Sequence, residues 1–436
     1  MAALTVLAVA LLGHGLVSGR LRGLAITGPM VFVAVGFLTG SEVFDVASFD
    51  LKSETVIVLA EAALAVVLFS DAVRVDLRQL RGFIGLPTRM LGLGLPLVIG
   101  AGTLTMRYVV DLSWARAALI ASILAATDAA LSQAVLTDEE VPRCIRGSLN
   151  VESGLNDGLV LPAVTLFSAL VADSEGETAS FWIQFLAEQI GFGVLAGIVV
   201  GSTGGRLLAQ ASRKGWVEGI SGQLAALSLV GLAFLSAHAL GGNSFIAAFV
   251  AGVSFRAVGA EDAEHLSEFT EDSGQLLATL TFVVFGNALF GPAVDQLTVP
   301  IAISVVLSLT VVRMAPIALS LLGTGLRPPT LAFLGWFGPR GLASALFALT
   351  VLEETGAPAT DPVFVVVAWT VVVSVVVHGA SASWGAGRYA RWYERHRAGH
   401  PSTPSEGTEP MSMPRVRGAA MPRDVEASEP SPDDGS

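Results

Sequence analysis

Ionisable and amide side chains stand among glycine and leucine in one short stretch, NVESGLNDGLVLPA at residues 150–163. Glu152 and Asn156 are four residues apart in this stretch. Ser153 and Asp157 have the same spacing. On a helix each pair shares a face, and the second face is rotated by about 100° from the first. Such oxygen atoms are the ligands that small hard cations prefer, and a carboxylate also binds a proton. The stretch is therefore a candidate site for a proton or a small cation.

The surroundings of this stretch are apolar, as is most of the chain. Of the 436 residues, 53% are hydrophobic and 14% are charged, and the mean hydropathy is +0.67. Soluble domains carry about 25% charged residues. Apolar runs of about 20 residues, the length that crosses a hydrocarbon core of about 30 Å, recur almost from end to end. They predict an all-α polytopic membrane protein, because a transmembrane barrel would show alternating segments of about ten residues.

About thirteen membrane spans are predicted from the lengths of these runs. Polar residues interrupt the fifth and the twelfth. The expected span cores are residues 2–18, 24–40, 54–73, 83–106, 112–136, 146–172, 181–209, 219–239, 243–257, 275–293, 299–321, 328–352 and 361–386.

Arginine is concentrated in alternate loops between these spans, and the intervening loops are mostly acidic or neutral. By the positive-inside rule the arginine-rich loops face the cytoplasm. With an odd number of spans, the N-terminus then lies outside and the C-terminus in the cytoplasm of a multi-pass protein of the cell membrane. Lys52, Arg107 and Arg116 are the basic residues that do not fit this alternation.

The two ends of the chain carry different signals. The first apolar run lacks a basic region and a small-residue cleavage site, so it is interpreted as a retained span. Residues 387–397 are expected to form a basic cytoplasmic helix end. Residues 398–436 are rich in Pro, Ser and Glu and are expected to form a disordered acidic cytoplasmic tail. Nothing in this charge distribution indicates a nucleic-acid partner.

The polar interruption of the fifth span is Thr127-Asp128, set among small residues. Asp and Thr side chains divert backbone hydrogen bonds away from the helical ladder. Asp128 could therefore cap a second half-helix, and helix ends at the middle of a membrane bind ions in transporters.

Gly338, Pro339 and Gly341 surround Arg340 in the twelfth span. Proline and glycine there predict a broken helix, in which Arg340 compensates either exposed carbonyl groups or a buried acid. Glu152 is the acid that could pair with Arg340 and so steady the helix packing.

A charged side chain near the centre of a bilayer costs about 2.5–3.5 kcal/mol on insertion scales, so such residues usually face a bundle interior and serve a function. Asp157 and Asp128 are the strongest candidates, because burial and a nearby like charge both favour the protonated form of a carboxyl group. A carboxyl group that holds either a proton or a cation exchanges one for the other when it is exposed to each side in turn.

This chemistry needs no cofactor, and the sequence gives no indication of an enzyme. It contains no H-E-x-x-H, no G-x-S-x-G and no glycine-rich phosphate loop. The single cysteine, Cys144, excludes an internal disulfide and a cysteine metal cluster. A channel remains an alternative, with a continuous pore and no proton coupling.

Two short segments resemble each other. TRMLGLGLPL lies in the fourth span and VRMAPIALSL in the eleventh, and a span with a polar break follows each. The two spans run in opposite directions, which is the mark of the inverted repeats of secondary transporters.

Six motifs, spread in order over nearly all the membrane region, carry a family resemblance. They are ATDA at 126–129, ESGLNDG at 152–158, NSFIAAFVAGVSF at 243–255, FTEDSGQLLATLTFVVFG at 269–286, GPRGLASALFAL at 338–349 and SVVVHGASA at 374–382. The sequence resembles the monovalent cation:proton antiporter-1 family, the NhaP-type sodium/proton exchangers. The resemblance implies a thirteen-helix fold in which the fifth and twelfth spans cross as unwound helices.

The resemblance also implies a division of residues 1–386 into two parts. The transport core corresponds to about 54–172 and 275–386. The remaining spans, 1–40 and 181–257, lie toward the dimerisation side of a homodimer.

The family's residue roles carry over by position. Asp157 corresponds to the ion- and proton-binding acid, and Asp128 with Thr127 lines the same Na⁺ site. Ser153 corresponds to a hydroxyl ligand of that ion. The network that steadies the site corresponds to Asn156, Glu152 and Arg340.

The third span departs from the family pattern. Many relatives have Phe-Glu-Gly where this chain has Phe69-Ser70-Asp71, so an acid is displaced by about 100° around the helix. Glu61 and Asp71 are both candidate cavity residues, and Glu61 is preferred because it lies deeper in the span.

The family resemblance implies a secondary active Na⁺/H⁺ antiporter that serves pH homeostasis, with K⁺ or Li⁺ as other ions. The Asn156-Asp157 pair accompanies electroneutral exchange of one proton per cation in the family. A K⁺-selective antiporter of the same fold is the alternative, because ligand spacing at tenths of an ångström decides that selectivity.

Overall fold

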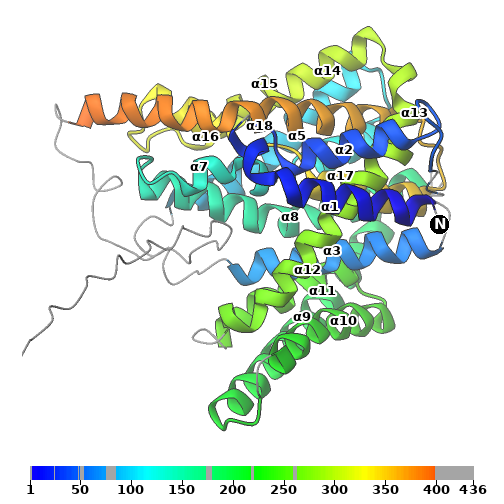
Figure 1. Ribbon diagram of the computed structural model, residues 1–436, viewed down its shortest axis with the longest axis vertical. Coiled ribbons are helices and arrows are strands. Elements are labelled where there is room, and N and C mark those ends of the chain that lie inside the picture. Colours follow the sequence, from blue (N-terminus) through cyan, green and yellow to red (C-terminus); the bar gives the residue numbers. More distant parts are fainter. Residues whose placement is uncertain are drawn as a thin grey trace, which may run out of the picture.

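The computed structural model describes residues 2–23, 25–47, 49, 54–74, 85–172, 179–217, 220–258 and 263–397. This part of the chain is helical and contains no strand. Helices α9 to α11 lie toward one end of the long axis and α14 to α16 toward the other, with α3, α8 and α17 between them (Figure 1). The acidic tail, 398–436, and the connection at 75–84 lie outside the described residues.

The described residues form thirteen consecutive helical segments, some of them interrupted. They are α1 (Ala2–Gly23), α2 (Gly28–Thr39), α3 (Glu54–Arg74), α4–η2–α5 (Gly85–Arg89, Met90–Gly94, Leu95–Val109), α6–η3–α7 (Trp114–Ile123, Ala130–Ser132, Gln133–Thr137), α8 (Arg143–Ala172), α9 (Ala179–Arg213), α10 (Ile220–Leu240), α11 (Ser244–Val258), α12–η4–α13–η5 (Ala263–Val284, Phe285–Phe290, Gly291–Ala293, Val294–Gln296), α14–α15 (Val299–Leu309, Val311–Ser320), α16–α17 (Pro328–Trp336, Leu342–Thr355) and α18 (Pro362–Arg397).

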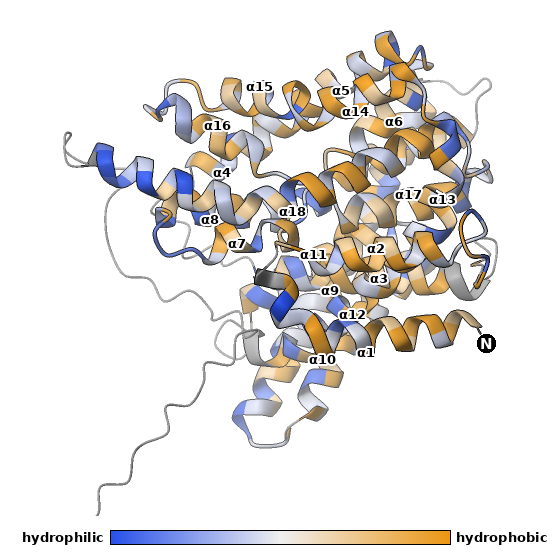
Figure 2. Cartoon of the chain, turned by 45° about the horizontal axis from the view of Figure 1, so that its top comes forward, coloured by the Kyte–Doolittle hydropathy of each residue, from blue (hydrophilic) through white to orange (hydrophobic). Residues whose placement is uncertain are grey.

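Each predicted span core overlaps one of these segments. Among the described residues, eight helices are long and apolar enough to cross a membrane, and three shorter apolar helices accompany them. Hydrophobic residues cover most of the helix surfaces, and hydrophilic residues gather at helix ends and in connections (Figure 2). This distribution fits an all-α membrane protein whose helix surfaces face lipid.

Two helices extend well beyond their predicted apolar cores. Helix α12 begins at Ala263, and its polar first turns are held by an ion pair between Glu271 and Arg74 of α3. The end of α18 is anchored by Tyr389, whose ring stacks on Phe333 with ring centroids 4.1 Å apart. Hydropathy marks only the part of a helix that crosses hydrocarbon, so it misses the start of α12. Residues 387–397, which were expected to form a helix end, lie in α18.

Close backbone contact joins α9 to α11. A Cβ atom added at Gly197 would lie 2.7 Å from the carbonyl oxygen of Ala247, and one added at Gly201 would lie 2.7 Å from the Cα atom of Ala251. The two glycines are four residues apart and share a face of α9. Small residues at this spacing let membrane helices pack backbone against backbone.

Among the interrupted spans, α6–α7 and α16–α17 lie in the interior of the bundle. Every residue from Ala117 to Ile123 of α6 is buried, and so is every residue from Ala343 to Leu352 of α17. Their freed backbone groups are therefore shielded from lipid, which is the condition under which a membrane protein tolerates irregular backbone.

We expect Gly201→Val to lower the free energy of unfolding by about 1–3 kcal/mol, because the new side chain meets the backbone of α11. Thermal unfolding of the detergent-solubilised protein measures this loss. Gly191→Val on the same helix is the matched control, since a Cβ there meets nothing within 4 Å. Equal unfolding temperatures for the two variants would contradict the close α9–α11 contact.

Candidate ion-binding site

The unwound segments of the fifth and twelfth spans cross and touch. Helix α6 ends at Ile123, and α16 ends at Trp336. The backbone N–H of Asp128 then donates a hydrogen bond of 2.8 Å to the carbonyl oxygen of Pro339. The predicted crossing of two broken helices is confirmed.

The side chain of Asp128 caps both helices that restart after the breaks. Its Oδ1 accepts a hydrogen bond of 2.8 Å from the N–H of Ala130, and its Oδ2 accepts one of 2.9 Å from the N–H of Leu342. A carboxylate at a helix N-terminus is also stabilised by the helix dipole. Gly341 leaves the room for this cap, because a Cβ there would lie 2.8 Å from the Asp128 side chain.

Arg340 satisfies carbonyl groups that the breaks expose. Its side chain is 1% exposed. Its Nε donates to the carbonyl oxygen of Leu124 at 2.8 Å, and its Nη1 donates to that of Gly338 at 2.7 Å. Its Nη2 reaches the carbonyl oxygen of Ser308 at 3.3 Å. Two roles were predicted for Arg340, and the structure shows the first of them, the compensation of exposed carbonyl groups.

The expected pairing of Glu152 with Arg340 is wrong. Glu152 instead forms a bidentate ion pair with Arg313 of α15, with N–O distances of 2.6 and 2.7 Å. Both side chains are almost fully buried, at 2% and 1% exposure. Gly338 makes room for the arginine, because a Cβ there would lie 2.5 Å from the Arg313 Nε atom.

Arg313 is the site-supporting residue whose role the sequence did not reveal. The residue could be recognised as a charge inside the eleventh span. Its partner depends on which face of α15 turns toward α8, and local sequence does not determine that rotation. The sequence offers one signal for this pair, which is the number of charged residues inside the spans. Arg340 is already one arginine there, so a second one, Arg313, needs an acid of its own.

The four residues predicted to bind a cation or proton come together where α8 passes the break of α6. The N–H of Thr127 donates to Oδ1 of Asp157 at 3.2 Å. The hydroxyl of Thr127 donates to that of Ser153 at 3.4 Å. All three side chains are buried, and Asp128 follows Thr127 in the same unwound segment.

Asn156 ties the unwound segment to α8. Its Nδ2 donates to the carbonyl oxygen of Ala125 at 2.9 Å and to the hydroxyl of Thr127 at 3.2 Å. Within the described part of the chain its Oδ1 has no hydrogen-bond partner. The amide therefore holds a freed carbonyl and orients a hydroxyl.

Of the two acids predicted to line the cavity, Asp71 is the one near the site. It interacts electrostatically with both Asp128 and Asp157. Glu61 interacts instead with Glu353 and His238, away from the crossing. The preference for Glu61 over Asp71 as a cavity residue stays a prediction.

Of the acids Asp128, Glu152 and Asp157, the last has the fewest hydrogen-bond and ion-pair contacts with the described residues. Asp128 accepts hydrogen bonds from two backbone amides and Glu152 is paired with Arg313, whereas Asp157 accepts a hydrogen bond from the Thr127 amide. Among the described residues no group of three His, Cys, Asp or Glu side chains could hold a metal ion.

A family comparison agrees with this geometry. The model of the family described as sodium/hydrogen exchanger, transmembrane, matches residues 5–386. The chain belongs to this family. The family resemblance predicted from the six motifs is confirmed.

Individual relatives are distant. The K⁺/H⁺ antiporter NhaP2 of Shewanella oneidensis is 25% identical over 366 residues, which are 82% of this chain and 62% of that protein. The Na⁺/H⁺ antiporter NhaS2 of Synechocystis is 25% identical over 329 residues, which are 74% of this chain and 60% of that protein. This member of the sodium/hydrogen exchanger family thus spans about six tenths of the length of these curated relatives.

A solved structure of the sodium proton antiporter MjNhaP1 from Methanocaldococcus jannaschii, at pH 8, has the same fold. Its TM-score is 0.72 at 19% sequence identity, and the match covers 89% of this chain and 100% of that one. The predicted inverted-repeat antiporter fold is thereby confirmed.

We expect Arg313→Met to lower the free energy of unfolding by about 3–5 kcal/mol, because it leaves the Glu152 carboxylate buried without its partner. Thermal unfolding in detergent measures the effect. Adding Glu152→Gln to that variant removes the stranded charge and should recover most of the stability. A double variant as unstable as the single one would show that the ion pair is not the cause.

Proposed function

We propose that the chain is a secondary active cation:proton antiporter in which H⁺ and a monovalent cation compete for the carboxylate of Asp157. The observation that carries this proposal is the hydrogen bond from the Thr127 N–H to that buried carboxylate, together with the bond between the Thr127 and Ser153 hydroxyls. These groups offer oxygen ligands to a cation, and the same carboxylate accepts a proton. The Na⁺ ion is cargo here, and the ligand set is Asp157, Asp128, Ser153 and Thr127.

Mutually exclusive occupancy is what couples the two ions. When the site faces one side, a cation arrives and the Asp157 proton leaves; when it faces the other, a proton arrives and the cation leaves. Alternating access between the sides produces exchange without a covalent step. One proton for one monovalent cation moves no net charge, so the exchange is electroneutral.

The names of the relatives give two candidate cations, Na⁺ and K⁺. NhaS2 of Synechocystis is named a Na⁺/H⁺ antiporter, whereas NhaP2 of Shewanella oneidensis is named a K⁺/H⁺ antiporter. The second name favours a K⁺-selective exchanger as the alternative function. Both candidates use the same carboxylate, so a transport assay with each ion separates them.

The assembly and orientation form part of the same proposal. The core of about 54–172 and 275–386 carries the site, and 1–40 with 181–257 faces the second copy of a homodimer. The separation of α9 to α11 from α14 to α16 is consistent with that division (Figure 1). The arginine-rich loops support an outside N-terminus and a cytoplasmic C-terminus in the cell membrane.

We expect Asp157→Asn to abolish exchange and leave the unfolding temperature unchanged or higher. The amide is isosteric, keeps an acceptor for the Thr127 N–H and removes a buried charge. In proteoliposomes that enclose a pH-sensitive dye, added Na⁺ or K⁺ drives proton movement in the wild type, and the variant should show none. Retained exchange in this variant would remove Asp157 from its role.

Asp128→Asn is the contrasting variant. One of its two caps is lost, because an NH₂ group cannot accept a hydrogen bond from a backbone N–H. We therefore expect a loss of stability of about 1.5–3 kcal/mol together with reduced exchange.

Cation flux in the wild type without proton movement would indicate a channel and contradict the antiporter.

A further inference from the structure

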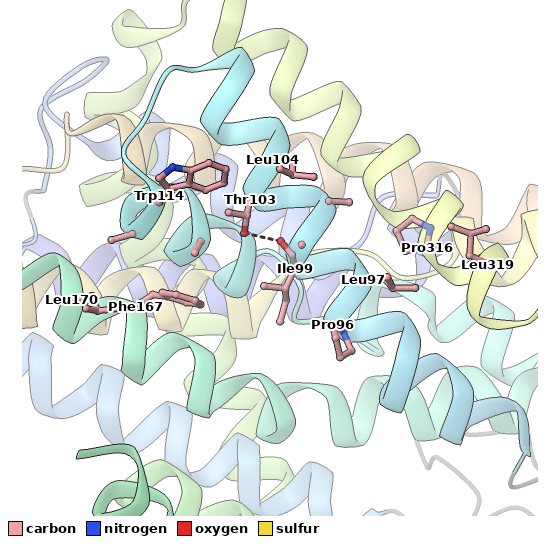
Figure 3. Close-up of a pocket in the computed structure, with 14 residues that line it drawn as sticks. Pro96, Leu97, Ile99, Thr103, Leu104, Trp114, Phe167, Leu170, Pro316 and Leu319 are labelled. Carbon is pink, nitrogen blue, oxygen red and sulfur yellow. Dashed lines mark hydrogen bonds between the residues drawn. The ribbon is translucent and has the colours of Figure 1, made fainter. Parts of the chain in front are cut away.

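An apolar groove of about 990 Å³ opens on the surface of the bundle between α5, α6, α8 and α15 (Figure 3). Pro96 and Leu104 of α5, Trp114 of α6, Phe167 of α8 and Leu319 of α15 are among the residues that line it. The ion-binding residues described above are not part of its lining.

Its walls offer almost nothing to a polar ligand. The hydroxyl of Thr103, a polar lining group, donates to the carbonyl oxygen of Ile99 in its own helix at 2.8 Å (Figure 3). Leu104 and Leu319 are about half exposed, at 51% and 54%. The surface therefore suits a hydrocarbon chain.

The length of the groove matches one leaflet. Its lining on α5 runs from Pro96 to Leu104, eight residue steps, which rise about 12 Å at 1.5 Å per residue. One leaflet contributes about half of the hydrocarbon core of about 30 Å. An extended acyl chain that lies along α5 would fill the groove.

A cationic and aromatic cluster stands at one end of the groove, about one helical turn beyond Leu104. The guanidinium carbon of Arg107 lies 6.0 Å from the ring centre of Tyr108 and 5.9 Å from that of Trp114. Trp and Tyr are enriched where a membrane meets water. The cluster therefore marks the level of lipid headgroups.

Arg107 has donors to spare for a phosphate. Its Nη1 binds the carboxylate of Asp111 at 2.7 Å and the carbonyl oxygen of Leu112 at 3.3 Å. In the described part of the chain no partner is recorded for its Nε and Nη2 atoms, and its side chain is 33% exposed. Guanidinium groups bind phosphate oxygens in pairs through such donors. Asp111 is 91% exposed, so water screens its competing charge.

We propose that this groove binds one anionic phospholipid, with an acyl chain between α5, α6, α8 and α15 and the phosphate on Arg107. Arg107 is one of the basic residues that do not fit the alternation of charge between loops. A bound phosphate would explain its position, because it supplies a negative charge for the guanidinium. The lipid would contact α8, which carries Ser153 and Asp157, and α6, which precedes the unwound segment of the ion site. Its binding would thus link the state of the membrane to that site.

The test uses two glycines of the same membrane span. A Cβ at Gly100 or at Gly92 meets nothing within 4 Å, so both positions accept a side chain. Gly100 lines the groove and Gly92 does not. Gly100→Leu should therefore occupy the space of the acyl chain without damaging the fold, and Gly92→Leu is its matched control.

Native mass spectrometry of the detergent-solubilised protein with dioleoyl phosphatidylglycerol measures the bound lipid. We expect one retained lipid on the wild type and on Gly92→Leu, and its loss from Gly100→Leu. Arg107→Gln should weaken retention about tenfold or more, since hydrogen bonds to charged groups contribute about 1.5–3 kcal/mol.

Equal lipid retention by the two glycine variants would overturn the proposal, and so would a wild type that holds no lipid. If Gly100→Leu converts a dimer into a monomer, a second copy of the chain covers the groove and the lipid assignment is wrong. Retention by Arg107→Gln equal to the wild type would overturn the phosphate contact.

Discussion

The structure depends on satisfying the backbone groups that two broken helices leave inside a membrane. Each unsatisfied group in hydrocarbon costs several kcal/mol, so a break survives only where other groups replace the helical hydrogen bonds. Here each unwound segment supplies hydrogen-bonding groups to the other. Asp128 of the first accepts the N–H of Leu342 in the second, and Arg340 of the second donates to the carbonyl of Leu124 in the first. The charges also match the helix dipoles. The Asp128 carboxylate lies at the N-terminus of α17, and the Arg340 guanidinium lies at the C-terminus of α6.

This requirement explains why so many charged residues surround the Asp157 carboxylate. Arg340 and Asp128 are taken up by backbone, and Arg313 and Glu152 neutralise each other out of contact with water. Such a buried pair adds little net stability, but it fixes the faces that α8 and α15 turn toward each other. Asp157 lies in the frame that these contacts hold, with its carboxylate against a hydroxyl-bearing segment.

Most of the architecture could be read from sequence because it follows from local composition. The spans follow from apolar length, and the breaks follow from Thr127-Asp128 and from the glycines and proline around Arg340. The meeting of Thr127, Ser153 and Asp157 was also anticipated. The partner expected for Glu152 was wrong because that partner depends on helix rotation and on which helices are neighbours, and these are set by packing along the whole bundle. The short π-helical turns Met90–Gly94 and Phe285–Phe290 were not anticipated either, since neither has a distinct composition.

The reciprocal bonding of the two breaks also has a consequence for how the chain is made. Asp128 and the Leu342 amide that it binds are 214 residues apart in sequence. Synthesis proceeds from the N-terminus, so the fifth span enters the bilayer long before the twelfth leaves the ribosome. Until then its freed carbonyl and carboxylate must be held by water or by the insertion machinery. Completion of the twelfth span is thus the step that allows the break in the fifth span to exclude water.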